Sequence, residues 1–224
     1  MARYEIEIKS LLGALEHAEA LKEQMRKRDP LCALTSQNSQ LNHYFEGGNV
    51  AELVRTCRDF FDSEKQEKLD TMVMRGKEFS VRTREKDGEV LLVLKASIDD
   101  TTSANGIARL EFEEAVDLTL AELDQKVLDA GFRYQAKWSR DREEYAYKGC
   151  NVCIDRNAGY GYLAEFEKIV EEEGDAQLAR AELEALMEEL GARELAQERL
   201  ARMFAHYNQN WPEYYGTDKV FVIE

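Results

Sequence analysis

The 224-residue chain has only two prolines and four cysteines, and no apolar run approaches the roughly 20 residues that a membrane helix needs. So few prolines exclude a Pro-rich linker, and the sparse cysteines exclude a disulfide scaffold. No apolar signal core precedes Glu5, so we expect no export. We therefore expect a reducing, cytoplasmic location and no membrane partner.

Positive charge is also in deficit, because 30 Lys and Arg stand against 45 Asp and Glu, a formal net charge of −15. Non-specific binding to nucleic acid needs clustered Lys and Arg, so we expect no nucleic-acid partner. Hydrophobic residues at 44% and charged residues at 33% describe a soluble globular protein. The length suits a single domain over residues 1–224, or at most two small ones, and we expect the single domain.

Two of the cysteines, Cys150 and Cys153, form a C-x-x-C pattern. No second Cys or His pair lies nearby to complete a zinc site. On a strand, residues three apart point to opposite faces. The pattern therefore gives little support to a metal role for this pair.

Charged and apolar residues alternate in the opening stretch RYEIEIKS, where Glu5, Glu7 and Lys9 follow Tyr4, Ile6 and Ile8 in turn. A strand sends successive side chains to opposite faces, so one face is charged and the other apolar. A single strand of this kind is normally a solvated edge of an antiparallel sheet.

The same pattern recurs along the chain, which predicts eight strands, at least five of them with charges at every second position. The predicted strands lie around residues 3–10, 40–46, 78–86, 89–97, 107–116, 133–147, 151–155 and 162–170. Asp87-Gly88 between the third and fourth is a hairpin signal.

Helical spacing separates or follows these strands. It predicts helices over 10–28, after Asn49 with a capping box to Glu52, from Thr119 with Glu122 to Gly131, and from about 175 to near Tyr207 with a break at Gly191. The segment 47–77 looks long for a connection. Five charged strand faces, together with helices to cover the apolar faces, suggest an antiparallel β-barrel with a polar lumen, an α+β fold. The barrel strands span about 3–170 and the helical tail about 175–224.

The charges of this predicted lumen are balanced. The basic set is Lys9, Arg82, Arg84, Lys95, Arg109, Arg140 and Arg142, and the acidic set is Glu5, Glu7, Glu111, Glu113, Asp155, Glu165 and Glu167. Mutual salt bridges are one way to satisfy such groups. Paired carboxylates are also good ligands for Mg²⁺ or Mn²⁺, and Arg and Lys suit phosphate oxygens. Together they indicate a site for a polyphosphate and a metal.

These elements resemble, in order, those of the CYTH superfamily, the triphosphate tunnel metalloenzymes. E-x-E-x-K at Glu5, Glu7 and Lys9 resembles the family signature, and SVRTR its R-x-R strand. The elements that follow in the family are resembled, in order, by the lysine of LLVLK, the strand RLEFE, the basic pair of SRDREEY, and the acids of CID and LAEFE. The match runs from Arg3 to about Val170; the long segment 47–77 and Glu114, which extends an acidic run, depart from the pattern.

The resemblance implies an eight-stranded antiparallel tunnel that binds a triphosphate end-on with Mg²⁺ or Mn²⁺. It implies metal ligands among Glu5, Glu7, Glu111, Glu113, Glu165 and Glu167, with Asp155 orienting an arginine or a metal-bound water. It implies phosphate contacts from the seven basic residues, with Glu5, Glu7 and Lys9 in the catalytic set. Lys219, in the aromatic tail, either closes over a tunnel mouth or is a plain surface lysine.

Three functions fit this resemblance. The first is a metal-dependent triphosphatase acting on inorganic triphosphate or on a small organic triphosphate such as ATP or thiamine triphosphate. The second is a class IV adenylate cyclase, in which a ribose hydroxyl replaces water as the nucleophile. The third is a non-enzymatic polyphosphate-binding module, which has no need of two E-x-E pairs. The sequence gives neither the substrate, the metal nor the choice between a monomer and a homodimer.

Overall fold

The computed structural model describes residues 4–97 and 109–223. The chain divides into two compact units, of which the first comprises Met1–Ser39 and Ser139–Glu224 and the second Gln40–Trp138. The single domain over residues 1–224 stays a prediction. None of the described helices combines the length and the apolar character that crossing a membrane requires.

Eight strands are hydrogen-bonded in the order β1-β8-β7-β6-β2-β3-β4-β5. They are β1 (Tyr4–Gly13), β2 (Ala33–Gly47), β3 (Lys77–Lys86), β4 (Glu89–Ser97), β5 (Arg109–Val116), β6 (Phe132–Tyr147), β7 (Cys150–Asn157) and β8 (Gly161–Val170). The predicted α+β class with eight antiparallel strands is confirmed. In the described residues the order ends at β1 and β5, so the strand pairs do not include the β1–β5 pair that would close a barrel.

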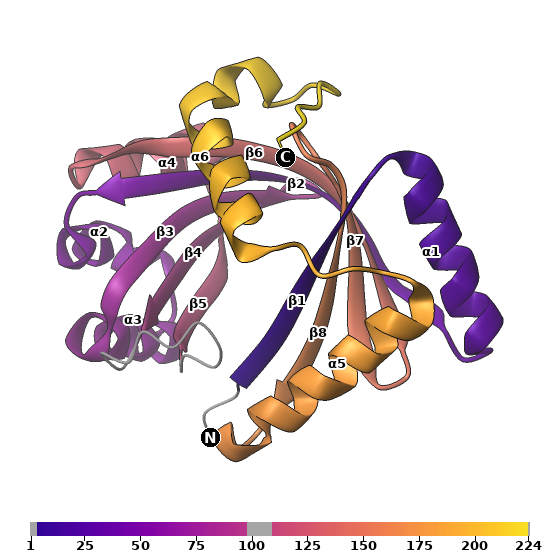
Figure 1. Cartoon of the computed structure of the whole chain (residues 1–224). Coiled ribbons are helices and arrows are strands. Elements are labelled where there is room, and N and C mark those ends of the chain that lie inside the picture. Colours follow the sequence, from indigo (N-terminus) through magenta and orange to yellow (C-terminus); the bar gives the residue numbers. More distant parts are fainter. Residues whose placement is uncertain (1–3, 98–108, 224) are drawn as a thin grey trace. The chain divides into compact units, whose positions relative to one another are not determined.

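In the first unit, helices α1 (Leu15–Arg28) and α5 (Ala176–Leu190) lie against the apolar faces of β1 and β8 (Figure 1). Ile6, Ile8 and Phe166 come from the strands and are buried in this core. The helices contribute Met25 and Leu183, both fully buried. Each such side chain contributes about 1.5–3 kcal/mol to folding when it leaves water. The sequence predicted helices over the apolar strand faces, and the burial of Ile6 and Phe166 against α1 and α5 confirms this.

A connector after α5 covers the outer edge of β1, the strand that begins the sheet order. The backbone N–H of Leu195 donates to the carbonyl of Lys9 at 2.7 Å. Exposed strand edges are templates for unwanted pairing, and a covering segment is one way in which proteins protect them. Helix α6 (Gln197–Tyr214) follows this connector.

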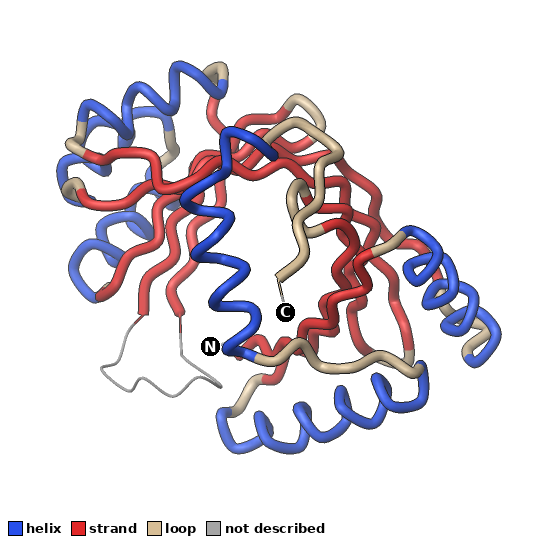
Figure 2. Tube along the Cα trace, turned by 45° about the horizontal axis from the view of Figure 1, so that its top comes forward, coloured by secondary structure: helices blue, strands red, loops and turns tan. Residues whose placement is uncertain are grey.

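In the second unit, three helices pack on the apolar faces of β3, β4 and β5 (Figures 1 and 2). They are α2 (Val50–Cys57), α3 (Ser63–Arg75) and α4 (Leu120–Asp129). Val81 is 1% exposed and Leu110 packs at the margin of the same core, as the alternation predicted. Arg82 and Arg84, which alternate with Val81, and Glu111 and Glu113, which alternate with Leu110, therefore lie on the opposite face.

A buried polar cluster connects α4 to the strands of this unit. Asp124 of α4 is 3% exposed and accepts hydrogen bonds from His43 at 2.7 Å, Thr83 at 2.5 Å and Tyr134 at 2.7 Å. Burial alone would raise the pKa of Asp124, but these hydrogen bonds outweigh it and lower the pKa. Thr83 lies between Arg82 and Arg84, so the cluster holds β3 next to two predicted phosphate-binding residues.

Asp124→Asn should lower the free energy of unfolding by at least about 2 kcal/mol, because a buried acceptor of charged hydrogen bonds loses its charge. The folded pKa of Asp124 is lowered, so its stabilisation is complete above the unfolded value near 3.8 and is lost as the pH falls below it. Urea unfolding at pH 7 and pH 3 should therefore show a smaller pH effect in Asp124→Asn than in the native chain. Asp129→Asn, at an exposed position of the same helix, is the matched control.

Several local signals are confirmed. Asp87 and Gly88 have φ of 51° and 89°, the positive values of a tight hairpin turn between β3 and β4. Asn49 and Thr119 each cap a helix by accepting from the backbone three residues on, and Thr119 and Glu122 form the full capping box.

Other boundaries were predicted wrongly. Ser10–Gly13 is not helical but completes β1, where it pairs with the start of β8 and turns at Gly13 with φ 71°. The segment 47–77 contains a second helix, α3, which the sequence reading missed. Helix α6 ends at Tyr214 rather than near Tyr207, because Tyr207 and Tyr214 stack within one aromatic cluster and hold the last turns in place despite Pro212.

Candidate functional site

The described site candidates of each unit lie together on one face of its strands. We call the charged face of the first unit the first polar face; it consists of Glu7, Lys9, Arg140, Arg142, Cys153, Asp155, Glu165 and Glu167. We call that of the second unit the second polar face; it consists of Tyr44, Arg82, Arg84, Lys95, Glu111 and Glu113. The two are described separately.

Strand register aligns the first polar face in rows. Glu7 of β1 is opposite Glu167 of β8, which is opposite Asn151 of β7. In the next row, Lys9 is opposite Glu165, and Glu165 is opposite Cys153. Like charges directly opposite each other destabilise a sheet unless a cation lies close. The Glu7–Glu167 pair is therefore an arrangement that favours cations.

Asp155 anchors the two arginines of this face. It is fully buried and accepts from Arg142 Nε and Nη2, both at 2.7 Å, and from Arg140 Nη1 at 3.1 Å. This bidentate fork is the strong form of the arginine–carboxylate pair. Both oxygens face guanidinium groups, so of the two roles left open by the sequence the contacts favour that of orienting arginines.

Glu165 lies between two cations and is 9% exposed. Its carboxylate is 3.0 Å from Lys9 Nζ and also accepts from Arg142. Burial alone would raise the pKa of Glu165, but Lys9, Arg142 and Arg140 outweigh it and lower the pKa to about 2. The group is therefore an anion throughout the neutral range.

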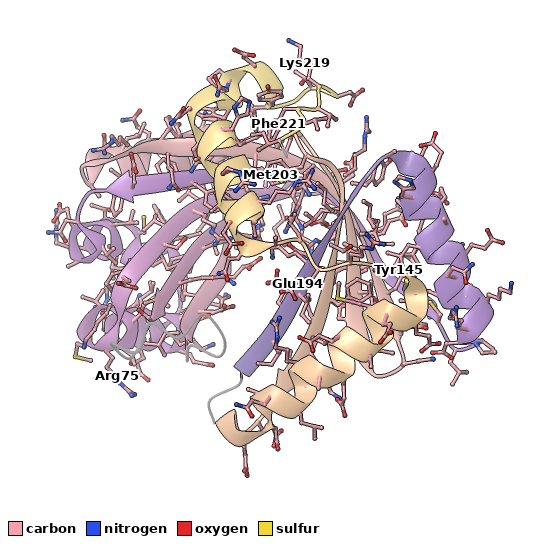
Figure 3. The ribbon with its side chains drawn as sticks, viewed as in Figure 1. Arg75, Tyr145, Glu194, Met203, Lys219 and Phe221 are labelled. Atoms are coloured by element: carbon pink, nitrogen blue, oxygen red, sulfur yellow. The ribbon has the colours of Figure 1, made fainter. Side chains whose placement is uncertain are left out.

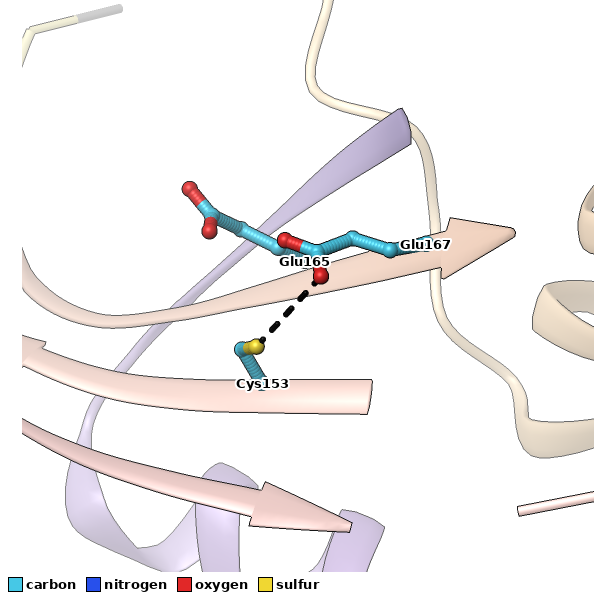
Figure 4. A group of neighbouring side chains, drawn as sticks. All are labelled: Cys153, Glu165 and Glu167. Atoms are coloured by element: carbon cyan, nitrogen blue, oxygen red, sulfur yellow. Dashed lines mark hydrogen bonds between the residues drawn. The ribbon is translucent and has the colours of Figure 1, made fainter. Parts of the chain in front are cut away.

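Glu165 is one of three side chains on this face that could bind a metal ion together. Cys153 Sγ and one carboxylate oxygen from each of Glu165 and Glu167 all lie within 4.8 Å of one another (Figure 4). Asn151 donates to Glu167 at 2.9 Å and steadies it. Burial raises the pKa of the Cys153 thiol, and the acids around it add to this effect against the Arg142 charge. At neutral pH the cluster therefore offers two carboxylates and a neutral thiol.

The donor set fits a divalent cation. Mg²⁺ and Mn²⁺ take carboxylate oxygens and keep several waters, so Glu165 and Glu167 suffice as protein ligands on this face. Glu7 is exposed and contacts Lys9, so it lies on the same surface. The side chain of Glu5, a further predicted ligand, lies outside the described part of the structure.

On the second polar face, two of three described cations are neutralised. Arg84 donates to Asn42 at 2.7 Å and to Glu113 at 2.6 Å, and Lys95 donates to Glu111 at 2.8 Å. The predicted acids Glu111 and Glu113 are thus occupied by these cations. The side chain of Arg109 lies outside the described residues.

Arg82 differs from its neighbours on this face. Its guanidinium lies over the ring of Tyr44, 4.4 Å from the centroid, and its Nε donates to Ser80 at 3.3 Å. Within residues 4–97 and 109–223, no carboxylate forms an ion pair with it. Cation–π stacking orients the guanidinium while its charge stays available to an anion.

Two further residues of the sequence analysis lie off these faces. Glu114, which extends the acidic run and departs from the family pattern, lies on the other face of β5 and pairs with Lys65 of α3 at 2.9 Å. Lys219 is exposed, and its side chain extends away from the ribbon (Figure 3). Its exposure fits the alternative of a plain surface lysine. The closure of Lys219 over a tunnel mouth stays a prediction.

The sequence reading missed residues that lack charge. Cys153 was considered only with Cys150, and the two do point to opposite faces, since Cys150 lies in the apolar core. The spacing of Cys153 two residues before Asp155 on one strand was the available signal that Cys153 shares the polar face. Asn151 and Tyr44 gave no such signal, because their roles depend on cross-strand neighbours that only the register defines.

The proteins found to be similar to this chain are solved structures. No family model fits the chain and no curated protein is similar to it. The PH1819 protein from Pyrococcus horikoshii matches with TM-score 0.59 and 21% identity over 91% of this chain and 99% of its own. A "putative adenylate cyclase" from Vibrio parahaemolyticus matches with TM-score 0.56 and 13% identity over 90% and 99%.

A third match is a "putative adenylyl cyclase" from Hippeastrum, described as having a dominant triphosphatase activity, with TM-score 0.52 and 18% identity over 90% and 96%. At such identities the likeness concerns the fold alone. The chain has the fold of these proteins, so the eight-stranded antiparallel fold that the resemblance implied is confirmed.

Proposed function

We propose that the protein is a divalent-metal-dependent triphosphatase that hydrolyses inorganic triphosphate or a small organic triphosphate. One observation carries the proposal: the carboxylates of Glu165 and Glu167 converge next to Lys9 on a strand face whose arginines are oriented by a buried aspartate. The shared fold supports it, because one structure with that fold is described as having a dominant triphosphatase activity.

Each polar face has a separate role in this proposal. A bound Mg²⁺ or Mn²⁺ would be held by Glu165 and Glu167, with Glu7 directly or through water, and would supply Lewis-acid charge at phosphate oxygens. Lys9, Arg140 and Arg142 bind and orient phosphate on the first face. On the second face, Arg82 is available to a phosphate, while Arg84 and Lys95 become available by exchanging their carboxylate partners.

A cyclase that converts ATP to cyclic AMP and pyrophosphate is the second candidate, favoured by the adenylate cyclase descriptions of structures with this fold. One panel decides. The purified protein with Mg²⁺ or Mn²⁺ is given triphosphate, ATP and thiamine triphosphate, and phosphate, pyrophosphate and cyclic AMP are measured. Phosphate release is the expected result. Cyclic AMP with stoichiometric pyrophosphate would replace the hydrolase by the cyclase, and no turnover would leave a binding module.

Arg82→Lys should keep the charge but reduce kcat/KM at least about ten-fold, equivalent to about 1.4 kcal/mol of transition-state stabilisation. Lysine is a point charge that cannot present the planar fork of arginine to two phosphate oxygens. Steady-state kinetics on the preferred substrate measures the effect. Arg75→Lys, at the exposed end of α3 (Figure 3), is the matched control. Equal kinetics in both variants would place Arg82 outside the site.

A further inference from the structure

The first polar face contains one donor that a magnesium enzyme has no use for. Cys153 is fully buried, yet its side chain lies among carboxylates and not in the apolar core (Figure 4). We propose that Cys153, Glu165 and Glu167 together bind a thiophilic divalent cation of the Zn²⁺ and Cd²⁺ class, in competition with Mg²⁺ or Mn²⁺. The competition rests on the proposed function, whereas the binding does not.

The distances suit one ion shared by sulfur and oxygen. Zn–S bonds of about 2.3 Å and Zn–O bonds of about 2.1 Å place two tetrahedral ligands about 3.6 Å apart. Cys153 Sγ is 3.8 Å from Glu167 Oε2, so these two atoms already stand at nearly the required separation. The Glu165 oxygen lies within 4.8 Å of both and reaches the same ion by a small side-chain rotation.

The surroundings allow that rotation. Glu165 is held by Lys9 and Arg142, and each keeps another carboxylate if Glu165 turns away. Lys9 also contacts Glu7, and Arg142 keeps the bidentate pair with Asp155. Binding by Glu165 therefore leaves no cation of this face without an anion among the described residues.

The ligand chemistry separates the two classes of metal. Mg²⁺ and Mn²⁺ take oxygen ligands, so for them Cys153 is only a neutral neighbour. Zn²⁺ and Cd²⁺ favour thiolate, and a bound ion displaces the thiol proton to solvent as the metal–sulfur bond forms. A three-ligand site with one sulfur should therefore retain these ions far more tightly than the carboxylates alone.

Cadmium absorbance tests the site directly, because a thiolate-to-cadmium charge-transfer band in the near ultraviolet reports a metal–sulfur bond whatever the activity. The titration uses the full chain with Cys32→Ser, which removes the half-buried cysteine outside the cluster. We expect one equivalent of Cd²⁺ to saturate the band. Adding Cys153→Ser should abolish the band and weaken binding at least ten-fold by calorimetry.

Two controls keep the result interpretable. Cys150→Ser removes a thiol on the same strand but on the opposite face, and its band should persist. Glu167→Gln retains the thiol and should weaken Cd²⁺ binding, and melting temperatures establish that each variant is folded. The proposal is overturned if the band survives Cys153→Ser, or if the Cys32→Ser protein shows no saturable band.

The outcome separates this site from the proposed function. Mg²⁺ added to the cadmium complex should raise the apparent Kd for Cd²⁺ if the ions share Glu165 and Glu167. A Cys153-dependent band in a protein that turns over no triphosphate would leave the thiophilic site standing and end the proposed function. Triphosphate hydrolysis with no such band would do the reverse.

Discussion

Asp155→Asn should lower the free energy of unfolding by about 3 kcal/mol, the largest stability effect that we expect from one polar substitution. Removing one partner of a buried ion pair costs about 3–5 kcal/mol, because the remaining charge is left without compensation. Asp155 is fully buried and serves two guanidinium groups. The lower end of the range applies, since Arg142 keeps Glu165.

Urea unfolding at pH 7 measures this change as a lower midpoint with an unchanged slope. Asp141→Asn is the control, since this exposed carboxylate pairs with Arg156 at 3.6 Å and should contribute less than about 1 kcal/mol. A midpoint for Asp155→Asn close to that of Asp141→Asn would show that the guanidinium pair does not depend on this charge.

Glu165→Gln and Glu167→Gln should each raise the concentration of Mg²⁺ or Mn²⁺ needed for half-maximal activity by ten-fold or more. Each change keeps the volume and hydrogen-bonding capacity of the side chain but removes one negative charge from a site for hard cations. A metal titration of activity at saturating substrate measures the shift. Glu171→Gln, an exposed residue just beyond β8, provides the control and should not respond.

The alternative role of these carboxylates predicts a change of opposite sign. If Glu165 serves only as a partner of Lys9 and Arg142, its removal leaves each of them with one carboxylate partner fewer and so more open to phosphate. Substrate would then bind as well or more tightly, with no change in metal demand. An unshifted metal dependence in both variants would therefore refute the ligand role of Glu165 and Glu167.

Most of the strand faces could be predicted from the sequence because an alternating pattern has only one consistent orientation once helices cover the apolar side. Ile6, Val81 and Phe166 are buried for this reason. Local chemistry was equally decisive at the Asp87-Gly88 turn and at the Thr119 cap. In each case the determining residues are close neighbours in the sequence.

The distinction between Arg82 and Arg84 could not be predicted in this way. Both lie on one face of β3, two residues apart, and differ only in what the register places opposite them. Arg84 faces Asn42, and Arg82 faces Tyr44. The first part of β2 was missed because its residues are polar on both faces. Hydrogen bonds to Glu144 from Thr35 and Asn38 hold it, and no periodicity reports such contacts.

The hydrogen bond from Leu195 to Lys9 joins two segments that lie far apart in the sequence. The strand with the E-x-E-x-K motif is synthesised well before both of its neighbours, β8 and the connector at Leu195. Such long-range pairing is slow to form and leaves β1 exposed in the meantime. The residues of β1, Glu7 and Lys9 among them, thus reach their final environment only after β8 and the connector at Leu195 have been synthesised.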